Sequence, residues 1–179
     1  LVVLLLVIAF WADAQLTRVA SEPEAPIGST KGTNWLLVGS DSRVGLSEED
    51  IARLGTGGDI GTGRTDAIML LHLEGTSAQL ISIPRDSYVD VPGFGQDKIN
   101  AAFTYGGPQL LTHTVEANTG VSIDHYAEVG MGGLANIVDA IGGVELCPSE
   151  PIDDPLANLN VGAGCQEMDG ANALGYVRT

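Results

Sequence analysis

The stretch that decides the fold is Gly63–Asp86, GRTDAIMLLHLEGTSAQLISIPRD, in which charged residues bracket two apolar runs. Residues 67–73 and 78–83 predict two strands, and residues 74–76 predict a tight turn between them. An antiparallel pair places the start of the first strand beside the end of the second. We therefore expect four charged side chains to gather at one edge of the sheet: Arg64, Asp66, Arg85 and Asp86.

The hairpin is unusual in its charge. The chain carries 8 Lys and Arg against 23 Asp and Glu, a net charge of -15, yet both signs of charge meet at this edge. The planar guanidinium of arginine suits phosphate oxygens, and aspartate is a hard oxygen ligand suited to magnesium. The pattern indicates a metal-assisted phosphate site. A surface ion-pair network at the strand ends is the alternative.

The N-terminus predicts a membrane anchor. Residues 1–10 are an uninterrupted apolar run followed by Trp11, and a helix needs about 20 apolar residues to span a bilayer. We expect residues 1–12 to be the C-terminal part of a transmembrane helix and residues 13–33 to be an extracytoplasmic linker. A cleaved signal peptide is the alternative, with residues 12–14 as the cleavage site. The linker favours a retained single-pass anchor in the cell membrane.

Residues 34–179 are expected to form one exported domain, because their length fits a single hydrophobic core. A strand at 125–129, a helix at 131–141 and a strand at 143–147 indicate a layered α/β fold. Cys147 and Cys165, an even count in an exported domain, predict a disulfide at the base of a surface loop.

Three further segments bear on the site. A short strand at 35–38 ends in a polar turn with Asp41 and Arg43, where ligands gather in open α/β sheets, although an Asx turn is the alternative. Residues 47–54 predict a helix that begins with a capping box. Residues 168–179 predict a short helix followed by the start of a strand, which carries Arg178.

Six short motifs occur in order: Gly39–Arg43, Gly63–Asp66, Ser82–Asp86, Asp97–Asn100, Ile141–Val144 and Ala173–Arg178. Together they resemble the LytR-CpsA-Psr (LCP) family of cell-envelope proteins, over residues 34–179. The resemblance implies a mixed central β-sheet sandwiched between helices in α-β-α layers, with an apolar lipid-binding cavity. The family pattern continues past Arg178 with further arginines, so we expect the domain to be truncated at its C-terminus.

The resemblance also implies a reaction. Members of the family are phosphotransferases that take a glycopolymer from a polyprenyl-pyrophosphate carrier and attach it to peptidoglycan through a phosphodiester bond, with pyrophosphatase as a side activity. By that analogy Asp41 and Asp66 hold Mg²⁺, or Mn²⁺ in its place. The implied catalytic residues are Asp66, Arg64, Arg85 and Asp86. The implied pyrophosphate-binding residues are Arg43, Arg64, Arg85, Lys98, Asn100 and Arg178.

Two other functions compete with this one. A module that binds polyprenyl phosphate or wall glycan without turnover would need the same residues. A nucleic-acid-binding regulator is disfavoured, because phosphate-backbone affinity comes from a basic surface and this chain has a net charge of -15. The polymer could be teichoic acid, capsule or arabinogalactan. The composition, poor in lysine and rich in Ala, Gly and Val, together with the cysteine pair, is typical of a high-GC Gram-positive source such as an actinobacterium, which favours arabinogalactan.

Overall fold

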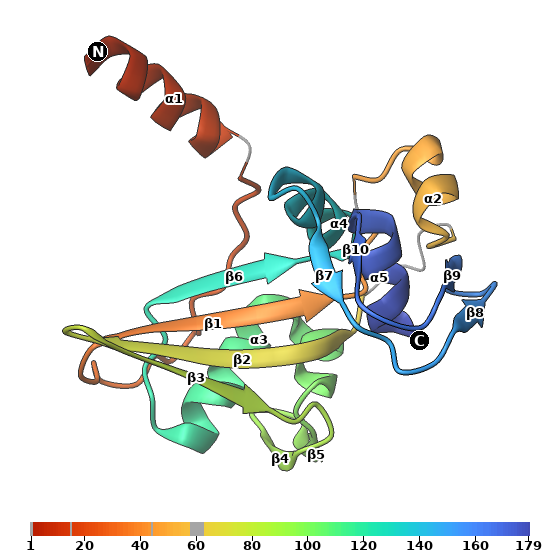
Figure 1. The fold of residues 1–179 in the computed structure, drawn as a ribbon. Coiled ribbons are helices and arrows are strands. Elements are labelled where there is room, and N and C mark those ends of the chain that lie inside the picture. Colours follow the sequence, from red (N-terminus) through yellow and green to blue (C-terminus); the bar gives the residue numbers. More distant parts are fainter. Residues whose placement is uncertain (1, 15, 44, 58–62) are drawn as a thin grey trace.

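The computed structural model describes residues 2–14, 16–43, 45–57 and 63–179 (Figure 1). The helices of this part of the chain are α1 (Val2–Ala14), α2 (Glu48–Leu54), α3 (Ala101–Thr119), α4 (Met131–Ala140) and α5 (Gly170–Arg178). The strands are β1 (Thr33–Ser40), β2 (Thr65–Glu74), β3 (Ser77–Ile83), β4 (Tyr88–Val91), β5 (Gly95–Lys98), β6 (His125–Val129), β7 (Val144–Leu146), β8 (Ile152–Asp154), β9 (Leu159–Val161) and β10 (Gln166–Met168).

The central sheet has the order β3-β2-β1-β6. β2 pairs antiparallel with β1 and β3, whereas β1 and β6 run parallel, so the sheet is mixed. The predicted hairpin is confirmed, with Ile68 opposite Ile83. The predicted fold class, a mixed α/β domain with helices flanking a central sheet, is also confirmed.

Helix α3 covers one face of the sheet (Figure 1). Alternate residues of β1 are buried, and Leu36 packs in one cluster with Ile68 of β2 and Leu111 of α3. The sequence predicts two helices here, at 99–105 and 108–118, separated by Gly106 and Gly107. In the structure they form the single element α3, whose backbone leaves the helical conformation at these two glycines. The opposite face of the sheet is left partly open, and Leu80 of β3 remains 60% exposed.

Residues 131–178 form a C-terminal lobe beyond the end of β1 and β6 (Figure 1). Val138 of α4, Leu159 of β9 and Ala173 of α5 share its hydrophobic core. Cys147 and Cys165 form the predicted disulfide. The loop between them contains the antiparallel pair β8 and β9, which its weak sequence pattern did not predict. The expected strand at the end of the chain is wrong, because Arg178 lies in the last turn of α5.

Helix α1 projects away from the domain, and its apolar side chains are exposed (Figure 1). Within the described part of the chain, no helix combines the length and the hydropathy that crossing a membrane requires. The segment between α1 and β1 is held against α3. Glu116 of α3, 1% exposed, accepts a hydrogen bond from the backbone N–H of Ile27 in this segment. It accepts another from the N–H of Ile123, which follows α3. The predicted linker is therefore docked on the domain along part of its length.

Close packing of α4 against α5 depends on Gly170, the first residue of α5. A Cβ at this position would lie 2.1 Å from the carbonyl oxygen of Ala135 in α4. The N–H of Gly170 donates to Oδ1 of Asp139 at 2.7 Å, and Oδ2 of Asp139 lies 3.4 Å from Arg53 of α2. This carboxylate therefore joins three helices where they converge.

We predict that Gly170→Ala lowers the free energy of unfolding by about 1–3 kcal/mol, because backbone cannot move aside as a flexible side chain can. Urea denaturation measures the change. Gly162→Ala is the matched control, since a Cβ there would meet no atom within 4 Å. A Gly170→Ala protein as stable as the Gly162→Ala control would contradict the close contact between α4 and α5.

Candidate active site

The charged ends of the hairpin meet as predicted. Arg85 forms an ion pair with Asp66 across β2 and β3, and its Nε lies 3.7 Å from Oδ2 of Asp86. Nζ of Lys98 on β5 lies 2.6 Å from Oδ1 of Asp86. These four side chains are all 51–58% exposed. The result is a solvent-accessible row of alternating charges at the end of the sheet.

Asp41 joins this site through the backbone. It follows β1 directly, and a register shift between Gly39 and Ser40 interrupts the pairing with β2. Bulges of this kind re-aim the chain at strand ends, often beside active sites. The N–H of Asp41 donates to the carbonyl oxygen of Arg64 at 3.0 Å, and the N–H of Arg64 donates to Oδ1 of Asp41. Asp41 and Arg64 are thus locked side by side.

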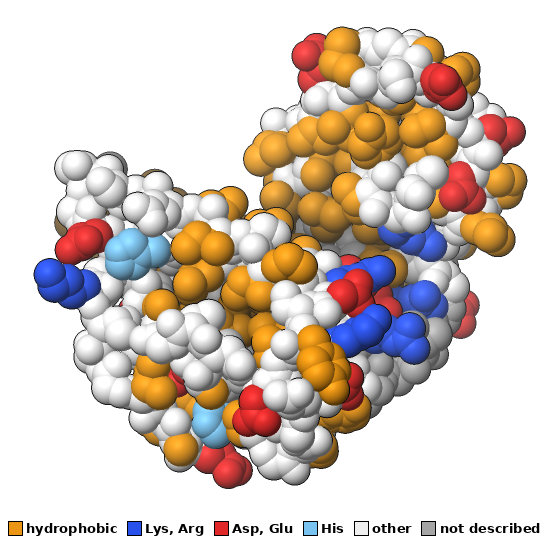
Figure 2. All heavy atoms as spheres, turned by 90° about the horizontal axis from the view of Figure 1, so that it is seen from below, with side chains coloured by type: hydrophobic (Ala, Val, Ile, Leu, Met, Phe, Trp, Pro, Cys, Tyr) orange, Lys and Arg blue, Asp and Glu red, His pale blue; other side chains and the backbone are white. Residues whose placement is uncertain are grey.

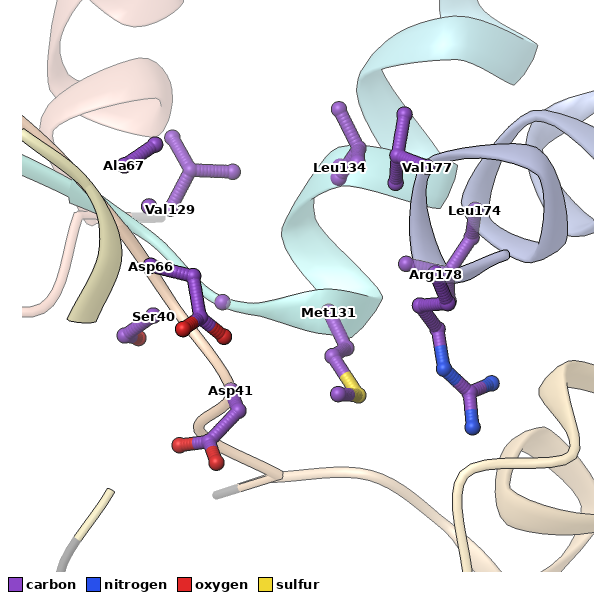
Figure 3. Close-up of a pocket in the computed structure, with 12 residues that line it drawn as sticks. Ser40, Asp41, Asp66, Ala67, Val129, Met131, Leu134, Leu174, Val177 and Arg178 are labelled. Carbon is purple, nitrogen blue, oxygen red and sulfur yellow. The ribbon is translucent and has the colours of Figure 1, made fainter. Parts of the chain in front are cut away.

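A pocket of about 400 Å³ opens between the end of the sheet and the C-terminal lobe. Figure 3 shows the carboxylates of Asp41 and Asp66 on one side of it, with apolar side chains from α4 and α5 across from them. The lining residues include Ala67, Val129, Met131, Leu134, Leu174 and Val177. The pocket therefore has an acidic rim and an apolar wall.

Figure 2 shows the surroundings of this pocket from another side. Hydrophobic side chains lie on both sides of the hollow between the two lobes, and basic and acidic side chains are grouped beside it. Beyond the pocket, the sheet face opposite α3 carries Leu37, Met69 and Leu71, which are partly buried, and the exposed Leu80. An apolar surface thus runs from the charged group along the sheet.

Lys98 and Asn100 both act on the turn that carries Arg85 and Asp86. Lys98 does so through its ion pair with Asp86, which lowers the pKa of that carboxyl, chiefly by the hydrogen bond and then by charge. The N–H of Asn100 donates to the carbonyl oxygen of Arg85 at 3.2 Å, and the N–H of Ile99 donates to that of Ser87 at 2.8 Å. The strand β5 and the start of α3 therefore hold this turn in place.

Two predicted arginines lie outside the row of alternating charges, although Arg178 lines the pocket from α5. The guanidinium of Arg178 donates to the carbonyl oxygens of Leu54 and Gly55, both at 3.2 Å, at the C-terminal end of α2. Figure 3 shows its side chain across the pocket from Asp41 and Asp66. The side chain of Arg43 lies against Gly57, where a Cβ would be 3.2 Å from its Nη1. Within the described part of the chain, Arg178 forms no ion pair with Asp66, which is paired with Arg85.

Sequence reasoning missed Glu128 on β6. Its Oε1 accepts a hydrogen bond from Oγ of Ser40 at 2.7 Å, and its Oε2 accepts one from the hydroxyl of Tyr126 at 2.9 Å. Burial, and then the charge of Glu128, raise the pKa of Tyr126. The one available signal was a carboxylate within a short predicted strand, and such a residue also occurs on many solvated strand faces.

A magnesium ion fits the donor set at the pocket rim. Asp41 and Asp66 both line the pocket, and magnesium is commonly held by one or two carboxylates while substrate oxygens and water complete its shell. In the described residues there is no group of three or more His, Cys, Asp or Glu side chains that could enclose a metal. The arrangement therefore suits an ion shared with a phosphate ligand rather than a closed structural site.

Comparison with known proteins identifies the family and several relatives of this chain. Residues 12–179 match the LytR_cpsA_psr family. The chain is 69% identical over 178 residues to the probable cell wall biosynthesis protein LcpB of Corynebacterium glutamicum, covering 99% of this chain and 43% of LcpB. It is 35% identical over 127 residues to the polyisoprenyl-teichoic acid–peptidoglycan teichoic acid transferase TagU of Enterococcus faecalis, covering 69% of this chain and 41% of TagU.

A solved structure agrees with the fold. The LytR-CPS2A-psr family protein YwtF (TagT) with bound octaprenyl pyrophosphate lipid superimposes with a TM-score of 0.65 at 25% identity, covering 92% of this chain and 66% of that one. The chain spans about two fifths of the length of LcpB and of TagU. Because the family match extends over residues 12–179, the chain belongs to the LytR-CpsA-Psr family.

Proposed function

We propose that this chain carries the active site of a phosphotransferase that moves a glycopolymer from a polyprenyl-pyrophosphate carrier to peptidoglycan. The observation that carries the proposal is the Asp66–Arg85 pair beside Asp41 at the rim of an apolar pocket. The name of TagU, a teichoic acid transferase, and the octaprenyl pyrophosphate bound to TagT support it. Teichoic acid is the polymer in the name of TagU. For this chain the polymer that we predict from the composition is arabinogalactan.

The two ends of the donor match two parts of the site. A polyprenyl chain is hydrocarbon, and the apolar wall of the pocket with the neighbouring sheet face can remove it from water. A pyrophosphate group needs cations and hydrogen-bond donors, which Arg64 and Arg85 provide at the rim. Lys98 and Asn100 hold the Arg85–Asp86 turn, Arg178 lines the pocket from α5, and Arg43 lies beside Gly57.

The transfer itself asks the protein for positioning and charge neutralisation. The oxygen of an acceptor sugar hydroxyl attacks the phosphorus attached to the polymer. The bond from that phosphorus to the bridging oxygen breaks, polyprenyl phosphate leaves, and the polymer ends in a phosphodiester. Arg64 and Arg85 stabilise the negative charge that develops on the phosphate oxygens. A Mg²⁺ ion held by Asp41 and Asp66 would supply further positive charge there.

The hydroxyl proton needs an acceptor. Asp86 is engaged by Lys98, which donates a hydrogen bond to it and lowers the pKa of its carboxyl. Asp86 also lies outside the residues that line the pocket, whereas Asp66 lines it. We therefore assign proton acceptance to Asp66 and the alignment of Arg85 and Lys98 to Asp86.

A binding module without turnover is the second candidate. Arg178 favours it, because this residue lines the pocket but its guanidinium already donates to carbonyl oxygens at the end of α2. The two functions share the donor and differ in whether polyprenyl phosphate is released. Extracytoplasmic localisation and anchoring in the cell membrane are part of either proposal, and the cell-wall role of LcpB is consistent with them.

We predict that release of polyprenyl phosphate from a short-chain polyprenyl-pyrophosphate sugar requires Mg²⁺ and falls about 100-fold or more in Arg85→Ala. The reason is that Arg85 places its positive charge where the transition state gains negative charge. Chromatography of the lipid product measures the rate in the full-length protein. Arg18→Ala is the control, because Arg18 is exposed and pairs only with Asp13 among the described residues.

Turnover that survives both removal of Mg²⁺ and Arg85→Ala would contradict the proposed site. Tight binding of the lipid without any release in the wild type would instead identify the binding module. Loss of activity in Arg18→Ala to the same degree as in Arg85→Ala would show that charge alone, regardless of position, explains the effect.

A separate prediction concerns Asp86. Its lowered pKa means that its ion pair with Lys98 persists at and above the ordinary carboxyl pKa of 3.8 and is lost only as the pH falls through the lowered value. Lys98→Met should therefore raise the pKa of Asp86 towards 3.8, as followed by carboxyl-carbon NMR. Tyr105→Phe is the control: it should raise the pKa of Asp97, which its hydroxyl lowers, and leave Asp86 unchanged. An unaltered titration of Asp86 in Lys98→Met would contradict the assigned pairing.

A further inference from the structure

Glu128 occupies a junction between the sheet and the pocket. It lies on β6 opposite Val38 of β1, on the same face of the sheet as Ser40, two residues further along β1. The residue after it, Val129, lines the pocket, and α4 begins at Met131. A change at Glu128 can therefore reach β1 and the pocket at the same time.

The contacts of Glu128 end on the turn that carries Asp41. Its Oε1 accepts the hydrogen bond of the Ser40 hydroxyl at 2.7 Å, and that hydroxyl oxygen lies 3.4 Å from the N–H of Ser42. The carbonyl oxygen of Ser42 in turn accepts the N–H of Met131 at 3.2 Å. The start of the turn is thus tied to β6, and its middle is tied to the first residue of α4.

On the side of β2 this turn is held only by the reciprocal bonds between Asp41 and Arg64 among the described residues. The register between β1 and β2 shifts at Ser40, so the regular ladder ends one residue before Asp41. The hydroxyl of Ser40 is on a side chain only 8% exposed, and its bond to a carboxylate is of the charge-assisted kind, which is stronger than a neutral one. Tyr126 donates to Oε2 at 2.9 Å and so fixes the orientation of the carboxylate.

We propose that Glu128 is a positioning residue: through Ser40 it fixes the turn at residues 40–43 and so sets the place of the Asp41 carboxylate at the pocket rim. Glu128 does not line the pocket and does not need to touch the donor. The inference rests on the proposed function only for its consequence, the binding of a divalent cation by Asp41. The positioning itself is a property of the protein alone.

Amide hydrogen exchange followed by NMR tests the positioning without any ligand. In Glu128→Leu, the amides of Ser42 and Arg64 should exchange about tenfold faster or more, because the turn loses its tie to β6 and the Arg64 N–H donates to Asp41. In Glu128→Gln, whose side-chain amide can still bond both hydroxyls, the same amides should change by less than about threefold. The amide of Leu36, in the core of β1, reports global stability.

Three results would overturn the proposal. One is unchanged exchange at Ser42 and Arg64 in a folded Glu128→Leu protein. Another is faster exchange at Leu36 to the same degree, which would show general destabilisation. The third is a Glu128→Gln protein as perturbed as Glu128→Leu, which would assign the effect to charge. If Glu128→Leu does not fold, Ser40→Ala removes the same link and should accelerate exchange at the same two amides.

Binding of Mn²⁺, measured by the electron paramagnetic resonance of the free ion, tests the consequence. Loss of a residue that orients a metal ligand typically weakens metal binding by about 10–100-fold, and we expect this for Glu128→Leu. Glu150→Leu, which removes the same charge from an exposed loop, should bind Mn²⁺ like the wild type. If the wild type binds no Mn²⁺, the proposed metal site fails, while the exchange data still decide whether Glu128 positions the turn.

Discussion

The register of β2 between β1 and β3 is the constraint on which the rest of the structure depends. It sets Ala67 opposite Gly39 and Ile68 opposite Ile83, so that one residue faces the pocket and the next faces α3. Side chains alternate along a strand, so a slip by one residue would send every one of them to the other face. The same register carries Asp66 to the rim and brings Arg85 against it.

The charged group at the rim contributes little to stability. Its ion-paired members, Asp66, Arg85, Asp86 and Lys98, are more than half exposed. Ion pairs between exposed side chains are typically worth about 0–1 kcal/mol, because water screens them and long side chains lose freedom. The fold is held instead by the core shared by Leu36, Ile68 and Leu111 and by the separate core of the C-terminal lobe. The rim residues are therefore better explained by the proposed pyrophosphate ligand than by folding. The chain has only eight basic residues, and three of them, Arg64, Arg85 and Lys98, lie in this group.

Local signals in the sequence were enough for most elements. The hairpin from 63 to 86, the capping box at Ser47 and the glycine pair at 106 and 107 each express a preference that acts within a few residues, and the structure contains all three. The β8–β9 pair was not predictable, because two three-residue strands leave no periodic pattern. The prediction for Arg178 was wrong for a different reason. Its guanidinium donates to the carbonyl oxygen of Leu54 in α2, more than a hundred residues away in the sequence. Glu128 was missed for the same reason, since its partner Ser40 is 88 residues distant.

The balance of charge at the rim bears on the proposed cofactor. Arg64, Arg85 and Lys98 contribute three positive charges, and Asp41, Asp66 and Asp86 contribute three negative ones, so the group at the end of the sheet is formally neutral. Arg178, across the pocket, is counted apart because its guanidinium donates to carbonyl oxygens at the end of α2. The chain as a whole carries -15, although salt at physiological strength screens exposed charges beyond about 8 Å. A pyrophosphate anion brought to a neutral group on an acidic protein gains little net attraction. A divalent cation shared by Asp41 and Asp66 would change the balance to +2 at the rim itself, which is the physical reason that we include it in the proposed function.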